Sequence, residues 1–280
     1  MSVRIVTDST CDLAQETVDS LGITVIPLHI QMGDRSYLDG VDITREEFYR
    51  WLPEFDPPPT TAAPGPEAMV AVYDALAAAG ASQVLSIHIS SSLSAVPDVA
   101  RVAAGQTISV PVTVLDSRQL SLGTGFLVET AAREARRGAS LPAILSKLEE
   151  QISRTHVFAA LATMEFLRRS GRVNTPMAGI GSLLQVKPIL KMYQGNSTSE
   201  RVRTTRGAER RLLELLSERF PLERIALVHT HADDKARVLL ARVAEELPPG
   251  EVPSVDITPV IGAHIGPGAV GFALIQAAKP

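Results

Sequence analysis

The chain alternates between short apolar runs and longer segments whose apolar residues recur at helical spacing. The run "VRIVTD" (3–8) is rich in β-branched residues and ends in polar ones, which predicts a strand. "DLAQETVDSLG" (12–22) then shows helical spacing and a final glycine, as helix ends often do. The same two patterns recur as far as residue 153. Further strands are predicted at 23–28, 83–89 and 112–116, and further helices at 67–79, 98–104, 121–137 and 140–153.

This order of elements predicts the fold class of residues 1–153. Strands that alternate with helices form a mostly parallel sheet with helices on both faces, so we expect an N-terminal three-layer α/β/α lobe. The proline-rich stretch "PEFDPPPTTAAPGPEA" (53–68) predicts an extended segment inside this lobe.

Residues 154–280 have a different pattern, which predicts a C-terminal two-layer α+β lobe. A chain of 280 residues is longer than one small core usually needs, which also favours two lobes. In this half we predict strands at 156–164, 224–231, 255–260 and 272–277, a strand that enters a turn at 187–197, and helices at 175–186, 206–219 and 233–246.

The composition is that of an ordinary globular protein, with 45% hydrophobic and 21% charged residues and a net charge of −4. The single cysteine, Cys11, excludes an internal disulfide and a zinc cluster built on cysteines. No apolar run approaches the roughly 18 residues of a membrane span, and the N-terminus does not resemble a signal peptide. We therefore expect a cytoplasmic protein without stable membrane insertion, and transient membrane contact stays open.

Positive charge is concentrated between Glu165 and Arg211. This segment holds ten Lys or Arg and three Asp or Glu, a local charge of +7 in a chain of net charge −4. Basic patches can bind nucleic acid, but few aromatic side chains are available here to stack on bases. We expect no nucleic-acid partner. Phosphate, an acidic protein surface or simply solvated helix faces remain as explanations.

The stretch "VIGAHIGPGAVG" (260–271) surrounds one histidine, His264, with glycines. Three of them match the dinucleotide fingerprint G-x-G-x-x-G, but no βαβ unit can follow before Pro280, so we reject a nucleotide site. The glycines predict a backbone that approaches either a ligand or a neighbouring strand very closely.

Hydroxyl side chains gather at two places. "SIHISSSLSAVPD" places Ser91, Ser92 and Ser94 where a strand meets a helix, and "PPPTTAAP" supplies Thr60 and Thr61. Open parallel sheets bind ligands beyond the carboxyl ends of their strands, and hydroxyls beside helix amides can hold an anion. Turn and capping roles are the alternative explanation.

Catalytic and metal motifs are sparse. No G-x-S-x-G, H-E-x-x-H or Walker sequence occurs. His229, His231 and Asp233 lie close enough in sequence to hold a metal, but hydrogen bonding or helix capping is the simpler explanation. We expect no metal and no cofactor.

An ordered set of motifs resembles the DegV family, the fatty-acid-binding subunits of bacterial fatty acid kinase. "IVTDSTCDL", "ITVIPLHI" and "YLDGVDITREEFY" are followed by "VLDSRQLSLGTG", "LRRSGRVN", "LLQVKPIL" and "IGAHIGPGAVGFAL". "TTAAP" stands where the family has T-S-Q-P, and "ISSSLSAVP" where it has S-S-x-L-S-G-T-Y.

The resemblance implies two lobes with one long-chain fatty acid between them, and a binding subunit that presents the carboxylate to a separate kinase without being an enzyme itself. By position, Thr61, Ser94 and His264 would bind the carboxylate, and Arg172 and Arg203 would serve kinase docking or phosphoryl transfer. Supporting roles would fall to Thr60, Ser91, Ser92 and Gly266. The sequence departs from the family at five loop positions, where an altered chain-length preference or affinity is expected: Ala62, Ala63, Ala95, Val96 and Pro97.

Two enzymatic alternatives remain. The predicted fold also resembles the substrate domain of dihydroxyacetone kinases, in which a histidine holds a carbonyl substrate covalently, and His264 would have that role. Metal-assisted hydrolysis by His229, His231 and Asp233 is the other.

Overall fold

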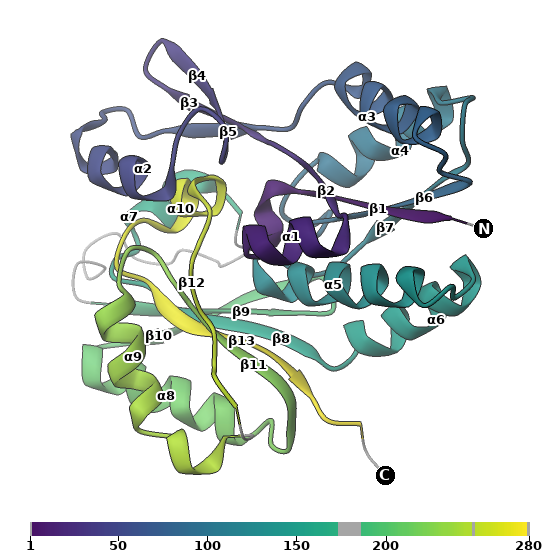
Figure 1. Ribbon diagram of the computed structural model, residues 1–280. Coiled ribbons are helices and arrows are strands. Elements are labelled where there is room, and N and C mark those ends of the chain that lie inside the picture. Colours follow the sequence, from purple (N-terminus) through teal and green to yellow (C-terminus); the bar gives the residue numbers. More distant parts are fainter. Residues whose placement is uncertain (1, 173–185, 248–249, 279–280) are drawn as a thin grey trace.

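The computed structural model describes residues 2–172, 186–247 and 250–278, and two large sheets dominate it (Figure 1). The first is a four-stranded parallel sheet with the order β2-β1-β6-β7. Its strands are β1 (Val3–Asp8), β2 (Thr24–Ile26), β6 (Gln83–His88) and β7 (Val112–Asp116). The predicted parallel sheet of the N-terminal lobe is therefore confirmed.

Helices cover both faces of this sheet, because its strands are apolar on both sides. Val3 and Ile5 pack in a cluster with residues of α5 and α6, whereas Val6 packs in another with residues of α3 and α4. The helices are α1 (Gln15–Leu21), α3 (Pro66–Ala78), α4 (Val96–Gln106), α5 (Leu122–Arg136) and α6 (Leu141–Ile152).

A small antiparallel sheet, with the order β4-β3-β5, stands above the parallel one. It consists of β3 (His29–Met32), β4 (Arg35–Leu38) and β5 (Thr60–Ala62), and the short helices η1 (Ser9–Cys11), α2 (Arg45–Trp51) and η2 (Leu52–Glu54) accompany it. The single strand predicted at 23–28 is thus wrong in extent. Pairing ends at Ile26 because Pro27 has no N–H to donate, and the chain then crosses into the small sheet.

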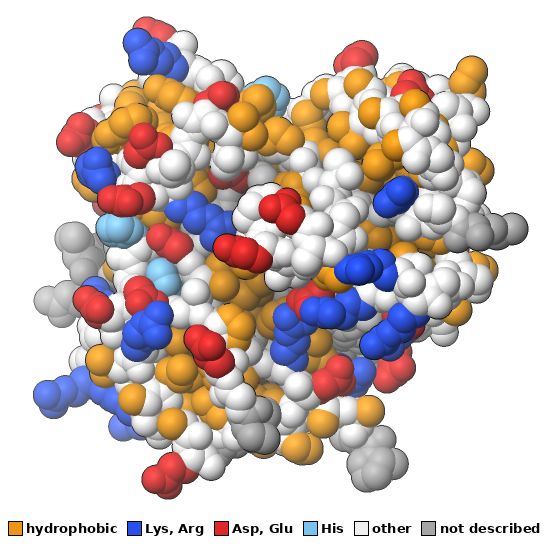
Figure 2. All heavy atoms as spheres, viewed as in Figure 1, with side chains coloured by type: hydrophobic (Ala, Val, Ile, Leu, Met, Phe, Trp, Pro, Cys, Tyr) orange, Lys and Arg blue, Asp and Glu red, His pale blue; other side chains and the backbone are white. Residues whose placement is uncertain are grey.

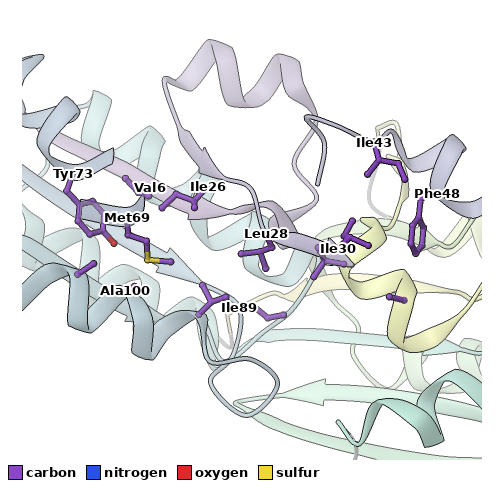
Figure 3. Packing of buried hydrophobic residues seen from close by; sticks show 14 of the residues in the cluster. Val6, Ile26, Leu28, Ile30, Ile43, Phe48, Met69, Tyr73, Ile89 and Ala100 are labelled. Atoms are coloured by element: carbon purple, nitrogen blue, oxygen red, sulfur yellow. The ribbon is translucent and has the colours of Figure 1, made fainter. Parts of the chain in front are cut away.

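One apolar cluster connects the two sheets of this lobe. Figure 3 shows it running from Tyr73 and Met69, through Ile26, Leu28 and Ile30, to Phe48 near the C-terminal helix α10 (Pro259–Ile265). The small sheet is therefore packed continuously with the core that supports the parallel sheet.

The second large sheet has six strands, in the order β10-β9-β8-β13-β11-β12, and all neighbours are antiparallel except β11 and β12. Helices α8 and α9 pack on one face, which confirms the predicted C-terminal layers. The strands are β8 (Thr155–Ala160), β9 (Lys187–Tyr193), β10 (Asn196–Val202), β11 (Leu222–His229), β12 (Ser254–Asp256) and β13 (Val270–Gln276). The helices are α7 (Glu165–Ser170), α8 (Thr205–Ser217), α9 (Asp233–Ala241) and η4 (Ala244–Glu246).

Some predicted boundaries in this half need correction. The strand at 255–260 ends at Asp256, and α10 begins at Pro259, since Thr258 has a non-helical backbone conformation and proline is favoured at the first helical position. The predicted helix at 233–246 ends at Ala241, and only a short 3₁₀ turn follows at 244–246. The predicted helix at 175–186 falls almost entirely outside the described residues.

Helix α5 lies between the two large sheets and belongs to the core of each. Leu127 and Val128 pack with the parallel sheet, whereas Leu122 and Phe126 pack against the six-stranded sheet. The Glu129 carboxylate accepts hydrogen bonds from Arg133, one turn along α5, and from Arg224 on β11. Figure 2 shows acidic and basic side chains interspersed where α5 and α6 meet the second sheet. The described helices include none long and apolar enough to cross a membrane.

Candidate ligand-binding site

A cavity of about 280 Å³ lies between α10, β5, the loop after β6 and the inner face of the six-stranded sheet. Its lining is mainly aliphatic and comes from both halves of the chain. Representative side chains are Leu28, Ile89, Val157, Leu190, Ile261 and Ile265. A long apolar ligand could bury most of its surface here.

Three predicted site residues line this cavity and supply polar groups: Thr61 on β5, Ser94 before α4 and His264 on α10. The Thr61 hydroxyl oxygen lies 2.8 Å from Nε2 of His264, although 203 positions separate the two residues. Ser94 Oγ accepts the N–H of Val96 at 3.3 Å, which leaves the hydroxyl proton of Ser94 for another acceptor. The structure thus brings the predicted carboxylate ligands to one cavity.

His264 is neutral at pH 7 in this setting. Burial lowers the pKa of its imidazole to about 4, and the nearby positive charge of Arg172 acts in the same direction. A neutral imidazole carries one N–H. With that hydrogen on Nε2, His264 donates to the Thr61 oxygen, and the Thr61 hydroxyl can then donate to an anion in the cavity. The pair can act as a short donor chain.

A polar second cavity of about 560 Å³, here called the vestibule, adjoins the polar groups. It is lined by Ser91, Ser92, Ser170, Arg172 and Asn196, among others. Ser94, Arg172 and Ser197 line both cavities. A polar group bound at Ser94 would therefore face the vestibule.

The predicted supporting residues lie in less direct positions. Thr60 is exposed and lines neither cavity, whereas the next residues along the chain, Thr61, Ala62 and Ala63, line the apolar one. Ser91 Oγ donates to Asp116, and Ser92 Oγ lies 2.9 Å from Ser90 Oγ, so both hydroxyls contribute to the loop that forms one wall of the vestibule.

The two predicted arginines are far apart. Arg172 is at the site, where its backbone carbonyl lies 3.5 Å from the Ser197 hydroxyl. Arg203 is exposed just after β10, six residues beyond Ser197. An antiparallel strand rises about 3.4 Å per residue, so Arg203 lies on the order of 20 Å from that end of the strand.

The glycines around His264 accommodate the protein's own atoms. A Cβ at Gly262 would collide with the Tyr49 ring, one at Gly266 with the Phe166 ring, and one at Gly271 with the backbone of β8. Neither cavity is lined by these glycines. Of the two explanations left open by the sequence, close packing of neighbouring elements applies at these three positions.

His229, the last residue of β11, and His231, two residues beyond it, belong to no group of metal-binding side chains among the described residues. His229 lies between two carboxylates, 3.4 Å from Asp233 and 3.5 Å from Asp256. His231 stacks on Tyr49 with ring centroids 6.0 Å apart. Among the described residues, no group of His, Cys, Asp or Glu side chains could hold a metal ion.

Polar residues that were not predicted as part of a site gather around the start of α10: Asp12, Asp39, Arg45, Tyr49 and Thr258. The pair Thr258–Pro259 is a helix-start signal that could have revealed the helix. No local pattern could have revealed its distant partners.

Comparison with known proteins agrees with this architecture. A family model described as "Uncharacterised protein, DegV family" matches residues 2–277. A DegV domain-containing protein of Streptomyces coelicolor is 35% identical over 274 residues, which cover 96% of each chain.

Solved structures show the same fold over nearly the whole length. A DegV family protein from Thermus thermophilus, described as binding fatty acid, has a TM-score of 0.88 and 34% identity, covering 99% of this chain and 100% of that one. DegV from Bacillus subtilis, described as a fatty acid binding protein, has a TM-score of 0.89 and 30% identity with the same coverage. With a two-lobed fold and a family match that spans nearly all of it, this chain belongs to the DegV family.

Proposed function

We propose that this protein binds one long-chain fatty acid, with the acyl chain in the apolar cavity and the carboxylate at Thr61, Ser94 and His264. The observation that carries the proposal is the 2.8 Å contact between Thr61 and His264 at the wall of a mainly aliphatic cavity. The fatty-acid binding described for the Thermus and Bacillus relatives supports it.

The energetics fit a ligand of this kind. Burying an acyl chain contributes about 0.8 kcal/mol per CH₂, so about a dozen methylenes could supply ~10 kcal/mol before the costs of binding. Affinity can therefore come from the tail. The polar groups need only orient the carboxylate and satisfy its oxygens, because an unpaired buried charge would be costly.

The same geometry suits presentation of the carboxylate to a separate kinase. Hydroxyls and a neutral imidazole leave carboxylate lone pairs available for attack, whereas a bidentate arginine would engage both oxygens. Phosphate would enter through the vestibule, where Arg172 supplies a planar guanidinium suited to phosphate oxygens. Arg203, being remote from the vestibule, would act at a docking surface. The protein itself would then have no turnover and no cofactor.

Purification followed by native mass spectrometry tests the binding. We expect about one fatty acid per chain, either carried from the cell or after incubation of delipidated protein with palmitate. An apo mass that persists with several fatty acids would refute the proposal. A covalent adduct of a small ketone on His264 would favour a dihydroxyacetone-kinase-like enzyme, although the aliphatic lining suits a small polyol poorly.

Two arginine variants test the kinase step. Arg203→Ala should bind fatty acid like the parent but support slower acyl-phosphate formation with a bacterial fatty acid kinase. Arg172→Ala should lower the rate even at saturating fatty acid, because it removes the cation that lines the vestibule. Unchanged rates in both variants would argue against phosphoryl transfer at this site.

A further inference from the structure

Helix α10, which carries His264, begins at a junction held by residues from the opposite end of the chain. The Asp12 carboxylate accepts the backbone N–H of Thr258 at 2.8 Å and the hydroxyl of Ser121 at 2.6 Å. The Thr258 hydroxyl donates to Asp39. Asp12 and Asp39 are only 1% and 5% exposed. Two buried carboxylates therefore hold the residue that caps α10.

Helix α2 holds the two residues before that cap. The Arg45 guanidinium donates to the carbonyl oxygen of Asp256 and lies 3.1 Å from the Asp12 carboxylate. The Tyr49 hydroxyl donates to the carbonyl oxygen of Ile257 at 2.9 Å. Figure 1 shows α2 beside α10. Each residue from Asp256 to Thr258 is thus hydrogen-bonded to the N-terminal half, an arrangement we call the α10 clamp.

The clamp is electrostatically costly. Burial raises the pKa of Asp12 to about 6 and raises that of Asp39, although Arg45 opposes both shifts. Two buried carboxylates with one arginine leave an uncompensated negative charge, and apolar packing would serve stability better. The directionality of these hydrogen bonds fixes the backbone where α10 starts, which apolar contacts do not do.

Position at the start of α10 determines position at His264. The helix has seven residues, and Thr258 and His264 are six residues apart, or about 9 Å along a helix axis. So short a helix moves as one body. A displacement at Thr258 would therefore change the contact between His264 and Thr61, because Thr61 lies on β5 of the small sheet and would not move with α10.

We propose that Asp12 and Asp39 are positioning residues that act through Thr258 to hold His264 against Thr61 and so set the strength of carboxylate binding. The effect on carboxylate binding rests on the proposed function, whereas the effect on the position of His264 is independent of it.

The test compares four variants: Asp12→Ala, Asp12→Asn, Thr258→Val and Glu129→Gln. Asparagine keeps an oxygen that can accept the Thr258 N–H and tolerates the left-handed backbone at position 12, where φ is 55°. Glu129→Gln is the matched control, because Glu129 is also a buried carboxylate paired with arginine and joins the lobes away from α10.

Palmitate affinity is the first measurement. We expect Asp12→Ala and Thr258→Val to weaken binding about tenfold, since each leaves a buried polar group unpaired at the clamp. Asp12→Asn should recover most of the loss, and Glu129→Gln should stay within about twofold of the parent. Equal losses of palmitate affinity in Thr258→Val and Glu129→Gln would mean that the clamp stabilises the fold in general without positioning His264, and would overturn the proposal.

The second measurement needs no ligand. An NMR titration of the His264 imidazole in the ligand-free protein should show its pKa rising from about 4 toward the ordinary value in Thr258→Val and Asp12→Ala, but not in Glu129→Gln. An unchanged titration in all variants would overturn the positioning role even if fatty acid binds. Failure of the parent to bind any fatty acid would instead refute the proposed function and leave this measurement intact.

Discussion

At the scale of single residues, two adjacent threonines on β5 have different environments and therefore different expected roles. Thr61 faces the cavity and contacts His264, whereas Thr60 is exposed on the other side. The two side chains are chemically identical, so only their direction distinguishes them.

Thr61→Val should weaken fatty-acid binding by about 1–3 kcal/mol, because the buried carboxylate would lose a hydrogen-bond donor. Thr60→Val is the internal control and should leave affinity unchanged. Isothermal titration of both delipidated variants with palmitate measures the difference. Equal affinities for the parent and Thr61→Val would mean that the carboxylate binds elsewhere.

Binding should also change the protonation of His264. Its pKa is about 4 without ligand, and a carboxylate placed beside it favours the imidazolium form, so we expect an upward shift. The pKa of His264 can be measured by NMR in the presence of palmitate and of hexadecanol. Both ligands bury the imidazole, but only the acid brings a negative charge, so the comparison separates the effect of charge from the effect of burial. A similar shift with both ligands would contradict a carboxylate contact.

At the scale of elements, close packing explains glycines that composition alone associates with turns. Gly271 lies within β13, against the backbone of Phe158 and Ala159 on β8. Gly105 lies near the end of α4 with open space where a Cβ would stand. The two positions therefore predict opposite responses to the same substitution.

Gly271→Ala should lower the free energy of unfolding by about 1–3 kcal/mol or more, because the added methyl group meets backbone atoms that cannot move aside. Gly105→Ala should raise it by about 0.5–1 kcal/mol through helix propensity. Urea denaturation of both variants provides the comparison. A stable Gly271→Ala protein would show that β8 and β13 can separate at little cost.

The alternating pattern was sufficient to predict most helices and the parallel sheet, since buried strands and amphipathic helices have distinct periods. It was not sufficient for α10, whose seven residues include Gly262 and give too few turns for a periodic signal. The contact between Thr61 and His264 spans the whole fold, so only the resemblance to a family could place these residues together. For the residues of the α10 clamp, neither a local pattern nor the family resemblance indicated a role.

At the scale of the whole molecule, α5 joins the lobes into one cooperative structure. Leu122 and Phe126 belong to one core and Leu127 and Val128 to another, on a single helix. The chain passes from α6 to β8 near residue 153, but division at that point would expose one face of α5 to water.

We therefore expect one thermal transition in scanning calorimetry, with equal calorimetric and van't Hoff enthalpies. Saturating fatty acid should raise its midpoint, because a ligand that binds only the native state stabilises all of it. Two resolved transitions, with only one shifted by ligand, would contradict the shared core.

Acid should destabilise the protein in part through His156, which is buried against Tyr193. Burial and the charge of Arg219 lower its pKa to about 4, compared with about 6.5 when unfolded. Its stabilising contribution is complete above the unfolded value and is lost as the pH falls toward 4. His156→Phe should therefore reduce the loss of stability between pH 7 and pH 5 by about 1–2 kcal/mol in urea denaturation. An unchanged pH profile would mean that this imidazole is accessible to water.

The position of α5 between the sheets also bears on how a ligand leaves. Separation of the two lobes would expose apolar surface of α5 and break the ion pair between Glu129 and Arg224. We therefore expect a bound fatty acid to exchange while α5 stays in place. Residence time would then be governed by small local movements near the vestibule, and it would respond to substitutions there far more than to denaturant.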